Sequence, residues 1–239
     1  MTIPALASSA KTATSTNNTI TPVSPADLAA GDLVVICVSS DVGTGVVAWV
    51  VTENSLPMNL MPSPADLPEK GGATAGTAAQ AFWSIYGGTG GFSATRTGGT
   101  GVHCAISLRW AAGTFDATTP FNAVNSTSSN LDEAALPSIT TTVPDTNVIG
   151  WGTWNQGKTR TAIPPSYTDV QWEDLSSHDS NVVRMDKAVA GVVASEDWTL
   201  SAPAETTAIQ FAVQEPQGGG GGGDEVQPTY RQLALLGVG

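Results

Sequence analysis

Short apolar runs separated by turn residues dominate the chain. Leu33 to Val38 is a continuous, largely β-branched run, which predicts a strand covered on both faces. A second run, Val46 to Val51, follows at the spacing of a hairpin partner. From Gly101 to Trp110 apolar and polar residues alternate, so we expect a strand with one buried and one solvated face. His103 falls on the polar face of that strand and is expected at the surface.

The other strand candidates are equally short and are bounded by glycine, proline or polar turn residues. They cover residues 80–86, 92–97, 136–140, 147–154, 169–174, 182–190 and 205–213. The proline-rich stretch from Glu53 to Thr77 is interpreted as a surface loop, and neither a helical period nor an internal repeat is evident. The pattern predicts an all-β protein, an antiparallel β-sandwich of the jelly-roll kind.

The ends of the chain differ in composition from its middle. Residues 1–27, rich in Ser, Thr, Asn, Ala and Pro, are interpreted as an N-terminal arm with one edge strand near residues 19–23. Residues 28–217 form the expected sandwich domain, and residues 218–239 begin with a six-glycine run that predicts a flexible tether.

The segment after the glycines is interpreted as a docking arm. It contains too few apolar residues to build a core of its own. Two interpretations remain open: the segment docks on its own body or frays, or it contacts a neighbouring subunit by adding a strand. The expected subunit-contact residues are Tyr230, Arg231, Leu233, Leu235 and Leu236.

The charge balance limits which classes of partner the protein can bind. Twenty-one acidic residues stand against nine basic ones, giving a formal net charge of −12, and no Lys/Arg cluster occurs, so nucleic-acid binding is disfavoured. No secretory leader or membrane-spanning run is present, which predicts synthesis in the host cytoplasm without a membrane anchor. Cys37 and Cys104 lie in apolar runs and are expected to be buried and reduced.

Few residues suggest a catalytic or metal-binding site. The two histidines, His103 and His178, have no metal-ligand spacing. The segment Glu173 to Asp179 crowds carboxylates, hydroxyls and His178, and it is either a Ca²⁺-binding loop or, by the simpler interpretation, a solvated one. No phosphate-binding loop or nucleophile elbow is found. We therefore expect no enzyme activity, no cofactor and no metal.

Three of the seven tryptophans are candidates for a glycan platform. Trp151 and Trp154 are three apart on a predicted strand and should project to opposite faces, and Trp172 follows soon after. One of the three could be an exposed platform for a sugar ring, whereas the alternative places them in the core or an interface.

Several segments together resemble a β-sandwich family of bacteriophage structural proteins, assigned to head decoration, tail or fibre components. The segments are residues 30–35, 81–86, 105–110 with 119–121, 137–142, 147–151 and 208–213. The resemblance covers most of residues 20–213 and implies a virion component without catalysis, with virion proteins as partners and homo-oligomers, trimers among them.

Three functions follow from this reasoning. The first is a capsid decoration, or cement, protein on the particle exterior, with terminal arms that hold neighbours together. The second is a tail or fibre component that binds a host glycan through an exposed tryptophan. The third is a sandwich-fold carbohydrate-active enzyme, which would need two carboxylates about 5 to 10 Å apart in a cleft.

Overall fold

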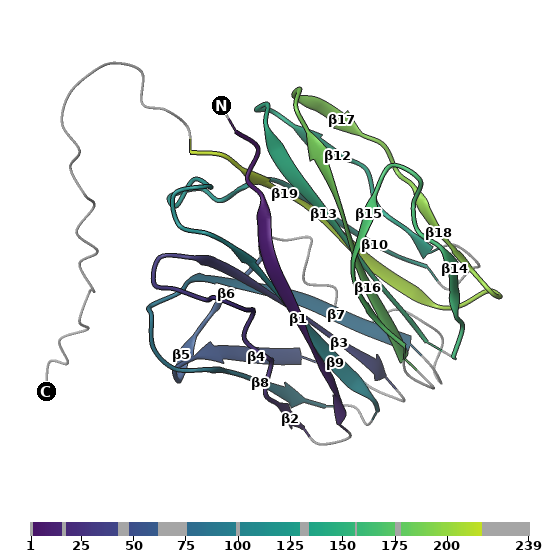
Figure 1. Ribbon diagram of the computed structural model, residues 1–239. Coiled ribbons are helices and arrows are strands. Elements are labelled where there is room, and N and C mark those ends of the chain that lie inside the picture. The colour runs from purple at the N-terminus through teal and green to yellow at the C-terminus, as the bar shows by residue number, and fades with distance from the viewer. Residues whose placement is uncertain are drawn as a thin grey trace, which may run out of the picture.

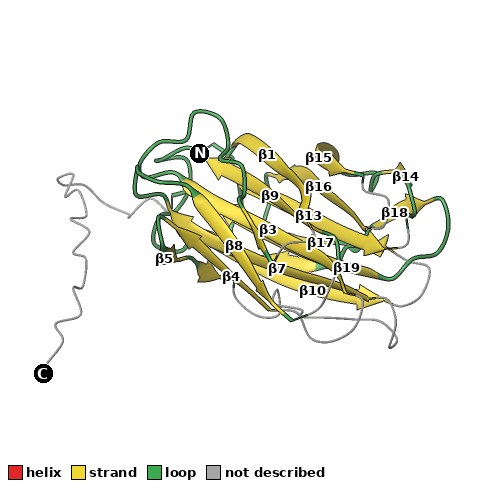
Figure 2. Cartoon of the chain, turned by 90° about the horizontal axis from the view of Figure 1, so that it is seen from below, coloured by secondary structure: helices red, strands yellow, loops and turns green. Residues whose placement is uncertain are grey.

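The protein consists of strands and loops, as Figure 2 shows. The computed structural model describes residues 2–15, 18–42, 48–61, 76–98, 101–129, 134–155, 157–174 and 178–216. Nineteen strands and no helix occur in these ranges, and every strand pairing is antiparallel. The prediction of an all-β antiparallel sandwich is confirmed.

The N-terminal half forms two sheets. The larger has the order β1-β9-β3-β7-β6, and the smaller has the order β2-β8-β4-β5. Their bounds are β1 (Leu6–Ser15), β2 (Thr19–Ile20), β3 (Leu33–Val42), β4 (Ala48–Glu53), β5 (Leu56–Pro57), β6 (Asn59–Leu60), β7 (Gly76–Ile85), β8 (Phe92–Thr97) and β9 (His103–Trp110).

The C-terminal half repeats this plan. Its larger sheet has the order β10-β19-β13-β16-β15, and smaller sheets of order β11-β18-β14 and β12-β17 lie outside it. The bounds are β10 (Phe121–Ser129), β11 (Ala134–Ala135), β12 (Ile139–Thr141), β13 (Thr146–Asn155), β14 (Arg160–Ala162), β15 (Thr168–Glu173), β16 (His178–Lys187), β17 (Gly191–Val193), β18 (Asp197–Leu200) and β19 (Thr206–Gln214).

Both halves have the strand order of a jelly roll. In that fold the first, eighth, third and sixth strands form one sheet, and the second, seventh, fourth and fifth form the other. β1-β9-β3-β7 and β2-β8-β4-β5 match this order, with β6 added at one edge. β10-β19-β13-β16 matches the first sheet again, with β15 added, and β11-β18-β14 matches the second, seventh and fourth positions of the other sheet, where no described strand takes the fifth position. We call the two units the N-terminal jelly roll (residues 2–110) and the C-terminal jelly roll (residues 121–216).

The two large sheets pack face to face through one apolar core. Val35 and Leu108 from the N-terminal jelly roll meet Trp151 and Ile209 from the C-terminal one in this core, and all four are buried. In Figure 1 the purple and blue half lies against the green and yellow half. The two jelly rolls are therefore joined by a continuous hydrophobic interior, which supplies most of the favourable free energy of such packing.

The contact between the halves follows an approximate two-fold relation. β3 packs on β13, β9 on β16, β7 on β19 and β1 on β15. Because β3 corresponds to β13, β9 to β19 and β7 to β16, exchanging the halves converts the β9–β16 contact into the β19–β7 contact. The centre of the interface has the self-complementary form of a two-fold dimer within a single chain, whereas the β1–β15 contact has no counterpart of similar extent between β10 and β6.

Each jelly roll also has its own core between its large and small sheets. In the N-terminal jelly roll, Val34, Ile36 and Trp49 belong to that core, and in the C-terminal one Leu136 and Val148 belong to it. The large sheets are thus covered on both faces. This explains why β9 is buried along nearly its whole length, whereas its alternating sequence predicted one solvated face.

Two further expectations were wrong in detail. The run Val46 to Val51 was expected to pair with β3, but β4 pairs with β8 and β5 in the smaller sheet, because successive jelly-roll strands alternate between sheets. Within the stretch expected to be a loop, from Glu53 to Thr77, the chain forms β5, β6 and the start of β7.

The N-terminal segment belongs to the sandwich and is not a separate arm. β1 pairs with β9 from Leu6↔Trp110 to Ser15↔His103, so it is a full edge strand of the large sheet. Its polar sequence fits an edge position, where one side of the strand meets solvent. The domain boundary predicted at residue 28 has no counterpart in the strand order. Residues 217–239, with the predicted contact residues Tyr230, Arg231, Leu233, Leu235 and Leu236, lie outside the described residues.

Candidate functional site

The proposed glycan platform does not form at two of its three positions. Trp151 and Trp154 project to opposite faces of β13, as predicted, but both faces of this sheet are covered. Trp151 is 1% exposed and its indole N–H donates to Ser180 Oγ at 2.7 Å, and Trp154 is 0% exposed. A buried ring cannot stack on a sugar, so Trp151 and Trp154 are core residues.

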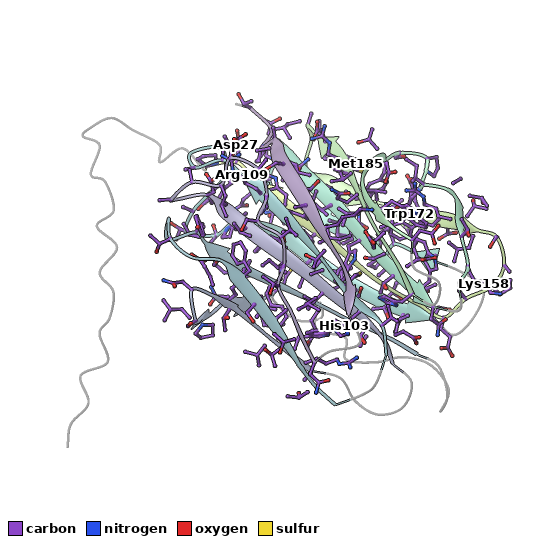
Figure 3. All side chains as sticks on the ribbon, turned by 60° about the horizontal axis from the view of Figure 1, so that its bottom comes forward. Asp27, His103, Arg109, Lys158, Trp172 and Met185 are labelled. Atoms are coloured by element: carbon purple, nitrogen blue, oxygen red, sulfur yellow. The ribbon has the colours of Figure 1, made fainter. Side chains whose placement is uncertain are left out.

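Trp172, on β15, is partly buried and lies under a cation. The Arg160 guanidinium carbon is 4.5 Å from the centre of the Trp172 ring, and the Trp154 ring is 5.4 Å away. A guanidinium over an indole is a favourable cation–π contact. Figure 3 shows Trp172 on the C-terminal jelly roll. The contact occupies a ring face that a sugar would need.

Arg160 is also held by a polar network. Its two terminal nitrogens donate to the two carboxylate oxygens of Asp169 at 2.8 and 2.9 Å, and one of them donates to Asn181 Oδ1 at 2.9 Å. The Trp198 indole N–H donates to the same amide oxygen at 2.7 Å. Burial alone would raise the pKa of Asp169, but the bonds from Arg160 and Asn181 outweigh it, so this pKa lies below its usual value. The network fixes Trp172 in place.

A second polar cluster lies between the jelly rolls. His178 is fully buried at the start of β16, with Nε2 2.8 Å from Ser39 Oγ and 3.0 Å from Thr153 Oγ1. Burial, and to a smaller extent His103, lower the pKa of His178 to about 3. The ring is therefore neutral near pH 7 and joins the halves by hydrogen bonds. The expectation that residues 173–179 form a solvated loop was wrong for Glu173, His178 and Asp179, which are buried.

Cys104 borders this cluster. Its sulfur is 3.3 Å from Ser39 Oγ, and burial raises its pKa to about 11 in spite of hydrogen bonds from Ser39 and Ser180. Cys37 is also buried, and both cysteines are free, as expected. A thiol with such a pKa is protonated at neutral pH, so this sulfur is not an activated nucleophile.

His103 is not a surface residue. It is 0% exposed, and its ring lies edge-on to Trp49 with 5.2 Å between centroids. Because the small sheet covers this face of β9, the polar position of the alternating pattern faces a second core. Figure 3 shows His103 and Arg109 at opposite ends of β9.

Three carboxylates of the described residues form ion pairs. Asp32 pairs with Arg109 at 2.5 Å, Glu173 with Lys11 at 2.9 Å, and Asp169 with Arg160. The Lys11–Glu173 pair joins β1 to β15 and so crosses between the jelly rolls. Within the described ranges, no group of three or more His, Cys, Asp or Glu side chains is placed to hold a metal.

The exposed apolar surface is aliphatic. The large apolar side chains that are exposed in the described part of the chain are Val23, Val50, Leu56, Leu60, Val189 and Val192. No helix among the described residues is long and apolar enough to cross a membrane.

No protein-family model matches the chain. No curated protein matches it either. A solved structure described as the crystal structure of the STIV MCP aligns with 87% of this chain and 97% of its own, at 8% identity and a TM-score of 0.26. A TM-score of this size supports neither a fold nor a function, so the assignment of two jelly rolls depends on the strand order alone.

Sequence reasoning also missed Arg96 as a residue of the interior. Arg96 on β8 is 2% exposed and follows Phe92 and Ala94 on the inward face. The alternation of these three positions was a signal, because the next inward residue after two apolar ones should also be buried.

Proposed function

We propose that this chain is a non-enzymatic structural protein of a bacteriophage particle and, more specifically, a capsid decoration protein on the particle exterior. The observation that carries the proposal is the fusion of two jelly rolls through a continuous apolar core. Jelly rolls serve as capsid building units, lectins and cupins. The choice among these three roles depends on which side chains fill the interior of each jelly roll and which groups lie on its surface.

The interiors favour a structural role. Cupins and many lectins use the space or rim of a jelly roll for a ligand. Here the N-terminal interior is filled by Ile36, Trp49 and Phe92, and the C-terminal one by Leu136 and Trp154. Two filled jelly rolls that share a third core form a stiff block, as a building unit requires.

The ends of the chain favour attachment to other subunits. The Thr2 backbone N–H donates to Glu215 Oε2 at 3.1 Å, so the first and last described residues lie side by side. The last described residues, up to Pro216, therefore lie at the same end of the molecule as Thr2. A tether from this end, with Leu233, Leu235 and Leu236 beyond the glycines, suits capture of a neighbour or of the capsid.

The acidic surface charge fits the exterior of a particle. A net charge of −12 disfavours contact with packaged nucleic acid. It also keeps a free subunit soluble at high concentration before assembly.

Cosedimentation tests the proposal. The full chain, a version ending at Gln217, and a full-length Leu233→Ser, Leu235→Ser, Leu236→Ser variant are mixed with purified capsids and, separately, with tails. Light scattering on each protein alone gives its oligomeric state. We expect the full chain to pellet with capsids and both altered proteins to bind at least tenfold more weakly. Binding to tails but not to capsids would replace decoration by a tail or fibre role.

The glycan-binding alternative now depends on Trp172 alone. Its ring is partly buried, and Asp169 and Arg160 beside it carry hydrogen-bonding groups. A glycan array with the full chain and a Trp172→Ala variant decides this alternative. For the enzyme alternative, Asp32, Asp169 and Glu173 are unsuitable, since each faces a cation and not a second carboxylate. Asp41 is the better candidate, because burial and the nearby Glu205 raise its pKa.

A further inference from the structure

The last inward-facing residue of β8 is the positively charged Arg96. Phe92 and Ala94 point into the core of the N-terminal jelly roll, and Arg96 takes the next inward position with 2% exposure. Removing a guanidinium from water has a large cost unless an opposite charge compensates it. The surroundings of Arg96 therefore have to account for its positive charge.

Among the described residues, the hydrogen-bond partners of Arg96 are all neutral. Nη1 donates to Ser40 Oγ at 3.0 Å and to the Gly101 carbonyl at 3.3 Å, and Nη2 donates to Asn18 Oδ1 at 3.4 Å. The three ion pairs among the described residues do not include Arg96. Its Nε–H is buried and has no partner within the described part of the chain. Burial lowers the pKa of Arg96, but a guanidinium remains charged at neutral pH.

Trp49 adds a second unused donor. It lies directly across from Arg96 on β4, and the two side chains share the inward face of the small sheet. Directly opposed side chains on antiparallel strands have Cβ atoms about 5 Å apart. The indole N–H of Trp49 is buried and has no partner in the described structure. Indole and guanidinium nitrogens donate but never accept, so neither group can satisfy the other.

The rest of the enclosure is compact. The His103 ring packs against Trp49, and its Nδ1 is 3.3 Å from the Gly101 carbonyl that also accepts from Arg96. Ser40, Trp49, Arg96 and His103 are each less than 5% exposed. An acceptor at this place has to be small.

We propose that Arg96 and Trp49 form a binding site for a small inorganic anion, chloride under cellular conditions. One monatomic anion accepts from Arg96 Nε and Trp49 Nε1 together and neutralises the buried guanidinium. It links β4 to β8 and, through Ser40, to β3, so anion binding stabilises the N-terminal jelly roll. The proposal is independent of the role in a virus particle.

Thermal unfolding of the full chain tests the site. Melting is followed in sodium chloride and in sodium gluconate at one fixed ionic strength. A ligand that binds only the folded state at about 50 times its Kd raises the melting temperature by roughly 5 °C or more for a chain of this size. We expect a saturable rise of this order with chloride and with bromide but not with gluconate.

Three variants separate the site from general salt effects. Arg96→Met should abolish the chloride response, and Trp49→Phe, which removes the indole N–H together with part of the ring volume but keeps an aromatic ring, should weaken it severalfold. Arg184→Met removes a partly exposed cation of β16 in the other jelly roll and should leave the response unchanged.

Bromide also gives a direct readout. Anomalous diffraction from crystals of the full chain soaked in sodium bromide should show a peak between Arg96 and Trp49. Equal melting in chloride and gluconate, or an undiminished chloride response in Arg96→Met, would overturn the proposal, as would a carboxylate of the chain itself at this position in the crystal. If Arg96→Met does not fold, Trp49→Phe and the bromide peak decide.

Discussion

His178 of the C-terminal jelly roll lies 2.8 Å from Ser39 of the N-terminal one, measured from Nε2 to Oγ, and both residues are fully buried. The bond joins the two halves at the polar end of their shared core. Because a protonated imidazole would be buried there, the contact makes the stability of the whole chain depend on pH.

Stability should fall as the pH drops below about 6.5. The pKa of His178 is about 3 in the folded protein and 6.5 as its ordinary value, so between these limits only the unfolded chain takes up this proton. The loss from this group between pH 7 and pH 5 is about 2 kcal/mol. Urea unfolding at both pH values measures it. A His178→Gln variant should show a difference smaller by that amount, and an unchanged difference would contradict the assignment.

Gly152 should not tolerate a methyl group. A Cβ at this position on β13 would lie 2.7 Å from ring atoms of Trp198. Trp198 belongs to β18 of the smaller outer sheet, and its ring packs against Gly152. We expect Gly152→Ala to lower the free energy of unfolding by about 1–3 kcal/mol. Gly91→Ala is the control, because nothing lies within 4 Å of its added Cβ. In a Trp198→Leu background the cost of Gly152→Ala should shrink; equal costs in both backgrounds would exclude the ring as its cause.

Asp32 should be a main stabilising residue at the end where the N-terminus lies. Its carboxylate accepts from Arg109 Nε at 2.5 Å and from the backbone N–H groups of Ala29 and Ala112 at 2.8 and 2.9 Å. Burial would raise the pKa of Asp32, but these bonds outweigh it and keep the pKa below its usual value. Asp32→Asn should cost about 2–4 kcal/mol at pH 7, since it leaves Arg109 without its counter-charge.

The control for Asp32 is Asp197→Asn on β18. Asp197 is exposed, and its substitution should change the free energy of unfolding by less than about 0.5 kcal/mol. Guanidinium unfolding of both variants makes the comparison. Equal effects of the two substitutions would show that the buried carboxylate has no special role.

Trp172 should act on stability and not on recognition. Replacing it by alanine removes the contacts with Trp154 and Arg160, which should cost about 2 kcal/mol. Calorimetry measures the loss, and a glycan array should show no difference from the parent chain. A Trp172→Ala protein that melts normally but loses a bound glycan would restore the platform hypothesis.

Local sequence patterns predicted individual strands better than their partners. Phe92 to Thr97 was predicted with the bounds of β8 because glycines flank a short alternating run. The same reasoning placed Val46 to Val51 beside β3, since hydrophobic period carries no information about which strand a segment pairs with. The duplicated jelly roll was invisible for that reason: it is a repeat of pairing order, not of residues.

The prediction of a glycan platform was wrong at Trp151 and Trp154 because the sequence pattern did not indicate that β13 is covered on both faces. The strand pattern correctly sent Trp151 and Trp154 to opposite sides of β13, but it could not show that a second sheet covers each side. His103 was misplaced for the same reason. Whether a polar residue such as Arg96 or His178 is buried depends on its tertiary neighbours, and the sequence of a single strand does not reveal these neighbours.

The order of the two jelly rolls along the chain has a consequence for synthesis. The N-terminal jelly roll is complete once Trp110 at the end of β9 reaches Leu6 of β1, before any strand of the second jelly roll has been made. At roughly 5–20 residues per second, the ribosome then takes several seconds to supply the remaining sheets. During that time the apolar face around Val35 and Leu108 has no cover. Because the interface is nearly two-fold, the best substitute is the same face of another nascent copy, so polysomes are where mispaired dimers of this protein should arise.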